Sequence, residues 1–302
     1  MRATADLGLE REMHLGARPL PLRWLARLWW FARRKPLGAT GAIMVAVVLF
    51  IAVFAPAIAP YGYSQQNLRN KFRAPSQQHV MGTDELGRDI YTRILYGARV
   101  SVTVGFSVVI ISVIFSVTVG MITGYFGGWF DTIAQRGVDI LLSFPELILL
   151  ITIISVFGIG LSQLILALAI GRIAGSSRVY RGLVLSLRQN AYLESARALG
   201  AGHMRIMLRH LLPNLIPYIL FSASIGLGGA ILAESSLSFL GLGVPPPNPT
   251  WGGMLNKGRN YVSTAPHMVI WPFTALALAV FGFNVLGDAL RDVLDPRLRG
   301  GR

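Results

Sequence analysis

Long apolar runs alternate with short polar segments along this chain, and the apolar runs have the length of membrane-spanning helices. A helix needs about 20 residues to cross the hydrocarbon layer of a bilayer. Six runs approach that length, and they cover residues 41–59, 100–125, 138–158, 161–180, 215–233 and 268–287. The pattern therefore predicts an all-α fold: a polytopic membrane bundle of six transmembrane helices.

The fourth run is the weakest, because Arg172 follows Leu161 after only eleven residues. We expect its helix to continue into the aqueous loop beyond it. Small residues in the other runs predict close helix packing in spans two to six, with span one added at the periphery. These small residues are Gly105, Gly120, Gly124, Gly226, Gly228 and Gly229.

Composition and charge support a membrane protein of defined orientation. The chain has 302 residues, of which 53% are hydrophobic and 14% charged, and its net charge is +14. Twenty of the 28 Lys and Arg residues lie on the side of the N-terminus, which predicts that both termini are cytoplasmic. The basic residues are spread over membrane-flanking loops, so we expect no nucleic-acid partner. Three arginines lie on the predicted outer side, where this rule expects few basic residues, and three acidic residues partly offset their charge. The arginines are Arg88, Arg93 and Arg99, and the acidic residues are Asp84, Glu85 and Asp89.

The polar segments divide the chain into regions. The residues from Leu22 to Lys35 predict an amphipathic or juxtamembrane helix. An outer segment turns at Gly82, Gly87 and Gly97, and a second one, at 241–266, is expected to be extended and stiff because it is rich in proline. Such loops suit docking or simply connect helices. The predicted regions are a cytoplasmic tail (1–40), the first span (41–59), an extracytoplasmic segment (60–97), a five-helix transmembrane domain (98–290) and a cytoplasmic tail (291–302).

Residues 190–213 interrupt the apolar pattern with two short predicted helices joined at a glycine. Asn190 can cap the first helix, and Gly200 supplies the left-handed residue that ends it. Tyr192, Ala196 and Leu199 are expected to share one face of the first helix, and the second runs up to Pro213.

This segment also carries five basic or titratable side chains, which cannot lie in lipid. We expect it to sit in water at one membrane face, where it can contact a soluble partner. The side chains are Arg197, His203, Arg205, Arg209 and His210, and we interpret the two histidines as a solvated pair.

Several kinds of chemistry lack the residues they need. Lys35, Lys71 and Lys257 are followed by Pro, Phe and Gly, so no GxxxxGK[ST] phosphate loop exists and ATP must bind elsewhere. The chain has no cysteine and its histidines have no metal-ligand spacing, so no cofactor or metal is expected on this chain. Ser107 lies in a GxS sequence, but no histidine base occurs within a span, which disfavours an intramembrane hydrolase.

Two acidic residues lie near the ends of predicted spans. Glu146 follows Pro145 near the start of span three and Glu234 lies at the end of span five, where either could reach the interface or line a pathway. A self-sufficient secondary transporter would need more such groups at mid-depth. From the residues alone, a secondary transporter remains the alternative to a permease that depends on a soluble partner.

The polar segment resembles the EAA motif of binding-protein-dependent permeases, with Glu194-Ser195-Ala196 followed by Gly200 and by Leu212-Pro213. Two positions depart from the motif, because Ser195 replaces an alanine and His210 an isoleucine. Further similar sequences are RRKPLG at 33–38, FAPAIAPY at 54–61, GTDELGRD at 82–89, YGAR at 96–99, GLGVPPPNPTWGGML at 241–255 and DALRDVLDPR at 288–297. Together they resemble the C-type permease subunits of dipeptide and oligopeptide ABC importers, in the peptide and nickel branch.

The resemblance implies a type I ABC importer permease fold, a non-catalytic subunit and a site in a bacterial or archaeal cytoplasmic membrane. It implies a homologous second permease subunit, two ABC ATPase subunits that bind ATP and Mg²⁺, and an extracytoplasmic substrate-binding protein. The substrate would be a peptide, with nickel or glutathione-type compounds as alternatives. The residues implied to couple to the ATPases are Glu194, Ser195, Ala196, Ala198, Leu199, Gly200, Ala201, Leu212 and Pro213.

Overall fold

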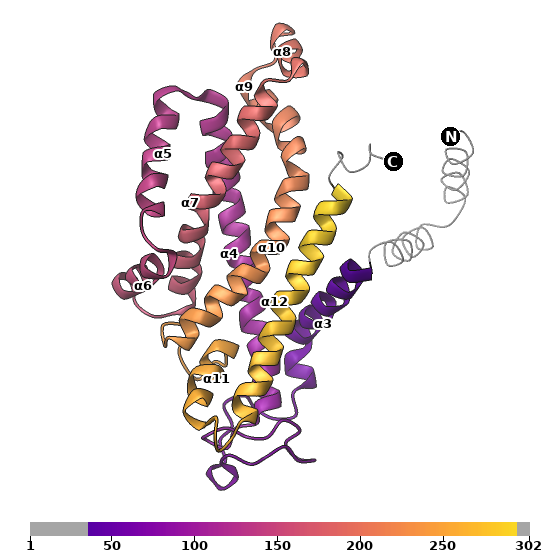
Figure 1. Cartoon of the computed structure of the whole chain (residues 1–302), viewed down its shortest axis with the longest axis vertical. Helices are drawn as coiled ribbons and strands as arrows, with labels where there is room; N and C mark the ends of the chain where they lie inside the picture. Colours follow the sequence, from indigo (N-terminus) through magenta and orange to yellow (C-terminus); the bar gives the residue numbers. More distant parts are fainter. Residues whose placement is uncertain (1–35, 295–302) are drawn as a thin grey trace, which may run out of the picture.

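The computed structural model describes residues 36–294, and within them the chain forms helices and loops with no strand. Figure 1 shows long helices running side by side along the molecule, with α8 at one tip and α11 near the other end. The all-α prediction is confirmed in this range. The helix predicted at 22–35 and residues 295–302 of the predicted C-terminal tail lie outside the described residues.

Four helices of the described range are long and apolar enough to cross a membrane, or five if one bent pair counts as a span. The prediction of six is therefore too high by this criterion. The four are α3 (Pro36–Ile58), α4 (Ile90–Phe126), the continuous helix from His203 to Phe239 that ends in α10 (Leu212–Phe239), and α12 (His267–Leu294).

The predicted third span is not one helix. It divides into α5 (Gly128–Leu142) and α6 (Glu146–Phe157), which meet at an angle of 92°. The break follows from Pro145, which has no N–H to donate within a helix and disfavours helical backbone at the residue before it.

The predicted fourth span corresponds to α7 (Leu161–Arg188), which extends past residue 180 as expected. It is not among the helices apolar enough to span a membrane, because Arg172, Arg178 and Arg181 interrupt it. Instead α7 packs lengthwise on α4. A Cβ at Gly120 would lie 2.7 Å from the carbonyl oxygen of Ser177, so this contact requires the small residue that the sequence predicted.

One continuous apolar core joins α3, α4, α6, α7, α10 and α12. The predicted peripheral helix α3 contributes Val45 and Val48 to it and packs against α12 and α4. Gly229, in contrast, has open space around it, so its predicted role in close packing is wrong. Lipid-facing and core-facing positions are both apolar here, which is why composition alone did not separate them.

Helix α4 begins within the predicted outer segment. Asp89 caps α4 by accepting a hydrogen bond from the Thr92 amide, 2.8 Å, so the helix begins ten residues before the predicted span. Gly82 and Gly87 have positive φ and form the expected turns, whereas Gly97 lies inside α4. Residues 241–266 are not extended throughout, because α11 (Trp251–Gly258) and a 3₁₀ turn (Arg259–Tyr261) fold within them.

Candidate coupling site

The polar segment 190–213 forms a short helical projection at one tip of the molecule (Figure 1). It contains α8 (Ala191–Ala198), α9 (His203–Ile206) and a π-helical turn, η2 (Met207–Leu211), that leads directly into α10. Two helices joined at a glycine were predicted from the sequence, and both are present.

Gly200 ends α8 as predicted, with φ of +80°. The Ala201 amide donates to the Ala196 carbonyl, 3.0 Å, and the Gly200 amide donates to the Arg197 carbonyl, 2.9 Å. This pair of bonds is a Schellman motif, which satisfies the last free carbonyls of the helix. Because a side chain at positive φ costs energy, glycine is favoured at this turn.

Asn190 occupies the N-cap position of α8, as predicted, but its side chain makes no capping bond. Its Nδ2 donates instead to the Leu187 carbonyl, 3.0 Å, at the end of α7. The side chain therefore links two consecutive helices.

The buried face of α8 holds the projection on the bundle. Leu193 is fully buried and joins a second apolar cluster with Met121, Tyr125 and Val184, and Ala196 is nearly as buried. These partners of Leu193 lie on α4 and α7, so α8 rests on the ends of two long helices. Tyr192, Ala196 and Leu199 were predicted to share one face of this helix. This is wrong in part, because Ala196 is buried whereas Tyr192 and Leu199 are exposed.

Tyr125 anchors the projection through polar contacts as well. Its hydroxyl lies 2.8 Å from Nδ1 of His203, and the guanidinium of Arg197 lies 5.5 Å from its ring centroid. Arg188 donates to its carbonyl oxygen, 3.1 Å. His203 is exposed, as the prediction of a solvated side chain requires, although its ring also contacts Tyr125.

The outward face of α8 and its turn carries most of the predicted coupling residues. Leu199 is 88% exposed. Met204 and Leu208 are also more than half exposed. The exposed members of the predicted set are Glu194, Ser195, Ala198, Leu199 and Gly200.

The remaining predicted residues lie elsewhere. Ala196 is buried in α8, Ala201 is half-buried, and Leu212 and Pro213 begin α10. Pro213 does not end the second helix, because the π-helical turn before it carries the chain without a break into α10. The structure thus separates the exposed tip from the base of the motif.

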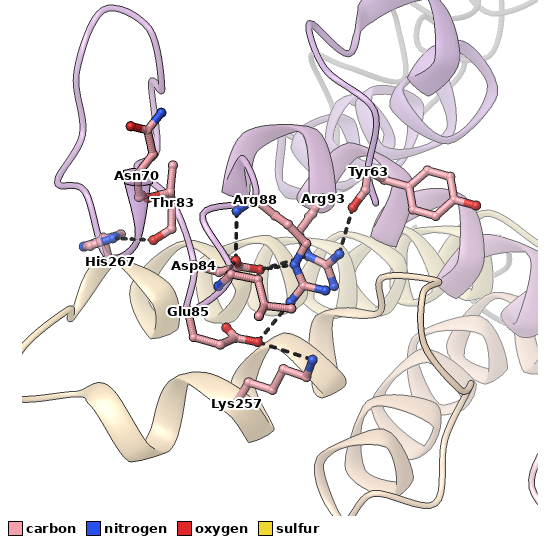
Figure 2. A network of polar contacts seen from close by, with 10 residues as sticks. Tyr63, Asn70, Thr83, Asp84, Glu85, Arg88, Arg93, Lys257 and His267 are labelled. Carbon is pink, nitrogen blue, oxygen red and sulfur yellow. Dashed lines mark hydrogen bonds and ion pairs between the residues drawn. The ribbon is translucent and has the colours of Figure 1, made fainter. Parts of the chain in front are cut away.

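A polar network at the other end of the bundle was only partly predicted. Asp84 accepts from Nε of Arg88, 2.6 Å, and lies 3.6 Å from Nε of Arg93, while Glu85 lies 3.0 Å from Nη2 of Arg88. Figure 2 shows these side chains converging with Lys257 of α11, whose Nζ is 3.3 Å from Glu85. The expected offset of arginines by acids is therefore a set of direct ion pairs for Arg88 and Arg93, whereas Asp89 pairs with His79.

Two further bonds complete this outer network. Nη1 of Arg93 donates to the Tyr63 carbonyl, 2.9 Å, and Nε2 of His267 donates to the Thr83 carbonyl, 3.1 Å (Figure 2). Because His267 begins α12, the segment before α4 is attached to both later outer elements. The contacts with α11 and α12 join residues about 170 or more positions apart, so the sequence alone did not predict them. The only indication in the sequence was the number of acidic residues and arginines in this segment.

Glu234 does not reach an interface as one interpretation expected. It is fully buried and accepts hydrogen bonds from Ser238, 2.7 Å, Ser101, 3.1 Å, and Ser235, 3.2 Å. Ser101 lies on α4, so the carboxyl group joins α4 to α10. Among residues 36–294, no group of three or more His, Cys, Asp or Glu side chains is arranged to hold a metal ion.

A bundle of apolar helices, four or five of which can cross a membrane in the described range, defines a polytopic membrane protein. The chain belongs to the family of binding-protein-dependent transport system inner membrane components, whose model matches residues 116–300. A second model, the N-terminal transmembrane domain of oligopeptide transport permease C, matches residues 23–75. The family expectation from the sequence motifs is confirmed.

Named relatives of high coverage support this assignment. The chain is 41% identical to the dipeptide transport system permease protein DppC of Alkalihalophilus pseudofirmus, with 88% of each chain covered. It is also 41% identical to the glutathione transport system permease protein GsiD of Escherichia coli O1:K1, with 90% of each covered.

The fold likewise resembles that of a solved importer. A chain of the MetNI methionine ABC transporter in an inward-facing conformation gives a TM-score of 0.56 at 21% identity. The match covers 67% of this chain and 96% of that chain. The bundle therefore has the architecture of an ABC importer permease.

Proposed function

We propose that this chain is one of two homologous membrane subunits of an ATP-driven importer of dipeptides or short oligopeptides. The transport pathway would lie between the pair, in a bacterial or archaeal cytoplasmic membrane with both termini in the cytoplasm. The name of the dipeptide permease relative supports the substrate class. The exposed apolar tip of α8 is the observation that carries the proposal.

ATP and Mg²⁺ bind on two separate ATPase subunits in this proposal, since the chain lacks a phosphate-binding loop. The ATPases would hold the tip formed by Glu194, Ala198, Leu199 and Gly200. Small side chains beside one large exposed leucine allow the helix to enter a groove, where Leu199 fills an apolar pocket. Glu194, which is exposed, can meet a basic residue there.

Motion of the ATPases would reach the bundle through the buried face of α8. Leu193 packs on the ends of α4 and α7, and Tyr125 ties the same region by hydrogen bonding. A short helix held on several sides moves as a unit, so displacement of α8 tilts the long helices beneath it. An extracytoplasmic binding protein would deliver peptide to the opposite end, at the outer segments.

Substitution of Leu199 by glutamate tests the coupling role. The side chain is 88% exposed, so the bundle should fold normally, while a charge in the apolar groove should lower ATPase affinity by about tenfold or more. Binding is measured by titrating purified ATPase subunits against the reconstituted permease pair, and peptide uptake is followed in parallel. Leu199→Met, which preserves an apolar side chain of similar size, is the matched control. Undiminished ATPase binding by Leu199→Glu would remove the docking role.

A glutathione-type substrate is the second candidate, favoured by the similarity to the glutathione permease. The two substrates differ in charge and in the γ-linked backbone of glutathione. Competition between a labelled dipeptide and unlabelled glutathione, in the complete importer, distinguishes them: efficient competition by glutathione alone supports the second candidate.

A further inference from the structure

A cleft of about 620 Å³ opens between α6, α7 and α10, away from the α8 projection. Seven leucines line it together with other apolar residues, and a few polar side chains interrupt them. Binding sites for small molecules commonly have this mixture of an apolar wall and a few placed polar groups. The polar groups that matter for a ligand are Glu146, Arg172, Tyr180, Tyr218 and Ser222.

Arg172 is held in place across α10. Its Nη2 donates to the Ser222 carbonyl, 2.8 Å, and a Cβ at Gly226 would lie only 2.1 Å from the same nitrogen. The guanidinium therefore occupies the space that Gly226 leaves open. Among residues 36–294, no carboxylate lies within ion-pair distance of Arg172, and the Ser222 carbonyl takes one of its five donors, which leaves others for a ligand in the cleft.

Arg172 lies in the interior of a helix and not at its end. It is eleven residues into α7, or about 16 Å along the helix, and Gly226 lies fourteen residues into α10, about 21 Å. The guanidinium is therefore held between the interiors of two helices of the bundle. An arginine that faces the inside of a membrane bundle usually marks a substrate or ion pathway.

The surroundings suit a carboxylate. The hydroxyls of Tyr180 and Ser222 are 2.6 Å apart beside Arg172, and Tyr218 lines the same space. Arginine binds carboxylates through two parallel hydrogen bonds. Glu146, at the start of α6, lines the cleft as well and is exposed. The cleft thus offers one cation and one anion, which matches a free peptide with a carboxylate at one end and an ammonium at the other.

We propose that Arg172 forms a carboxylate subsite on the transport pathway, where it binds the C-terminal carboxylate of a peptide in transit while Glu146 faces the peptide ammonium. This inference rests on the proposed peptide-import function and names one place where the substrate is held. Binding here is transient, because a pathway site must release its ligand as the helices move.

The absence of cysteine allows a direct test in the assembled importer. Gly175 lines the cleft and has open space around it, so Gly175→Cys places a thiol three residues from Arg172 without a clash. An anionic methanethiosulfonate reagent should modify it about tenfold faster than a cationic one. Arg172→Gln in the same background should abolish this preference, and Arg172→Lys should retain it.

Peptide protection then identifies the ligand. A dipeptide with a free carboxylate should slow modification, and the same dipeptide with a C-terminal amide should not. Rates should agree in phosphatidylcholine and phosphatidylglycerol nanodiscs, since a lipid headgroup is not the ligand. Equal rates for both reagents, an unreactive thiol, protection by both peptides, or dependence on the headgroup would each overturn the subsite.

Failure of the subsite is separable from failure of the proposed function. The measurements use complexes whose ATP hydrolysis and peptide uptake are recorded before cysteine modification. If uptake is intact and the charge preference is absent, the importer assignment stands and the carboxylate subsite is wrong. Thermal unfolding of Arg172→Gln and Arg172→Lys, compared with the parent, identifies any loss that comes from misfolding.

Discussion

Gly120 and Gly124 decide how closely α4 and α7 approach each other. A Cβ at Gly124 would lie 2.9 Å from the Arg181 carbonyl oxygen, and one at Gly120 would lie 2.7 Å from Cβ of Tyr180. Both helices are held through backbone atoms at these points, and backbone moves less readily than the end of a flexible side chain. The contact matters for function because α8 rests on the same ends of α4 and α7.

Gly120→Val should therefore destabilise the bundle by about 1–3 kcal/mol through overpacking. Thermal unfolding of the purified permease in detergent measures the loss. Gly182→Ala is the matched control, since Gly182 lies on α7 with nothing near its Cβ position. A stable Gly120→Val protein with unchanged unfolding would contradict the close approach of the two helices.

At the scale of elements, the segment between α3 and α4 is held by charge and not by an apolar core of its own. Asp84 pairs with Arg88 and lies near Arg93, and its Oδ1 also accepts from the amides of Leu86 and Arg88, each 2.9 Å. Arg88 is nearly fully buried, so removal of the Asp84 charge leaves it only partly compensated, through Glu85 at 3.0 Å. In the proposed importer this segment would face the binding protein, and we expect its order to depend on these pairs.

Asp84→Asn should loosen residues 60–89 by about 3 kcal/mol of local opening free energy. Amide hydrogen exchange, resolved by segment, should show faster exchange there, while α4 and α10 exchange as before. Arg69→Gln is the control, because Arg69 lies in the same segment and is exposed. Equal protection in Asp84→Asn and the parent would show that the ion pairs are not what orders the segment.

At the scale of the whole molecule, the two proposed docking surfaces lie at opposite ends and the same long helices join them. The α8 projection and the network around Asp84 are separated by the length of α4, which contributes to both (Figure 1). Nothing in the proposed mechanism lets the bundle drive transport alone, because the energy enters through partners at α8.

The permease alone in liposomes should therefore show no peptide uptake driven by a proton or sodium gradient. Uptake should begin when the second permease, both ATPases, the binding protein and ATP are supplied. A radiolabelled dipeptide measures flux in both preparations, with a detergent-permeabilised sample as the control for trapped label. Gradient-driven uptake by the single chain would favour the secondary-transporter alternative.

The sequence by itself determined the helical membrane character, the approximate positions of the apolar helices and the glycine turn at Gly200. These properties depend on local composition and on backbone preferences, which a short stretch of sequence expresses. The EAA-like spacing from Glu194 to Pro213 was also enough to indicate the family. The assignment of exposed coupling residues stays a prediction, although the structure places five of them at the tip.

Only the tertiary structure decided the right-angle break between α5 and α6, the buried face of α8 and the placement of Arg172 against Gly226. Lipid and protein core are equally apolar, so a hydrophobic pattern cannot say which face of a membrane helix packs and which meets lipid. Contacts such as Thr83 with His267 join residues far apart in the chain, and they exist only once the helices are assembled.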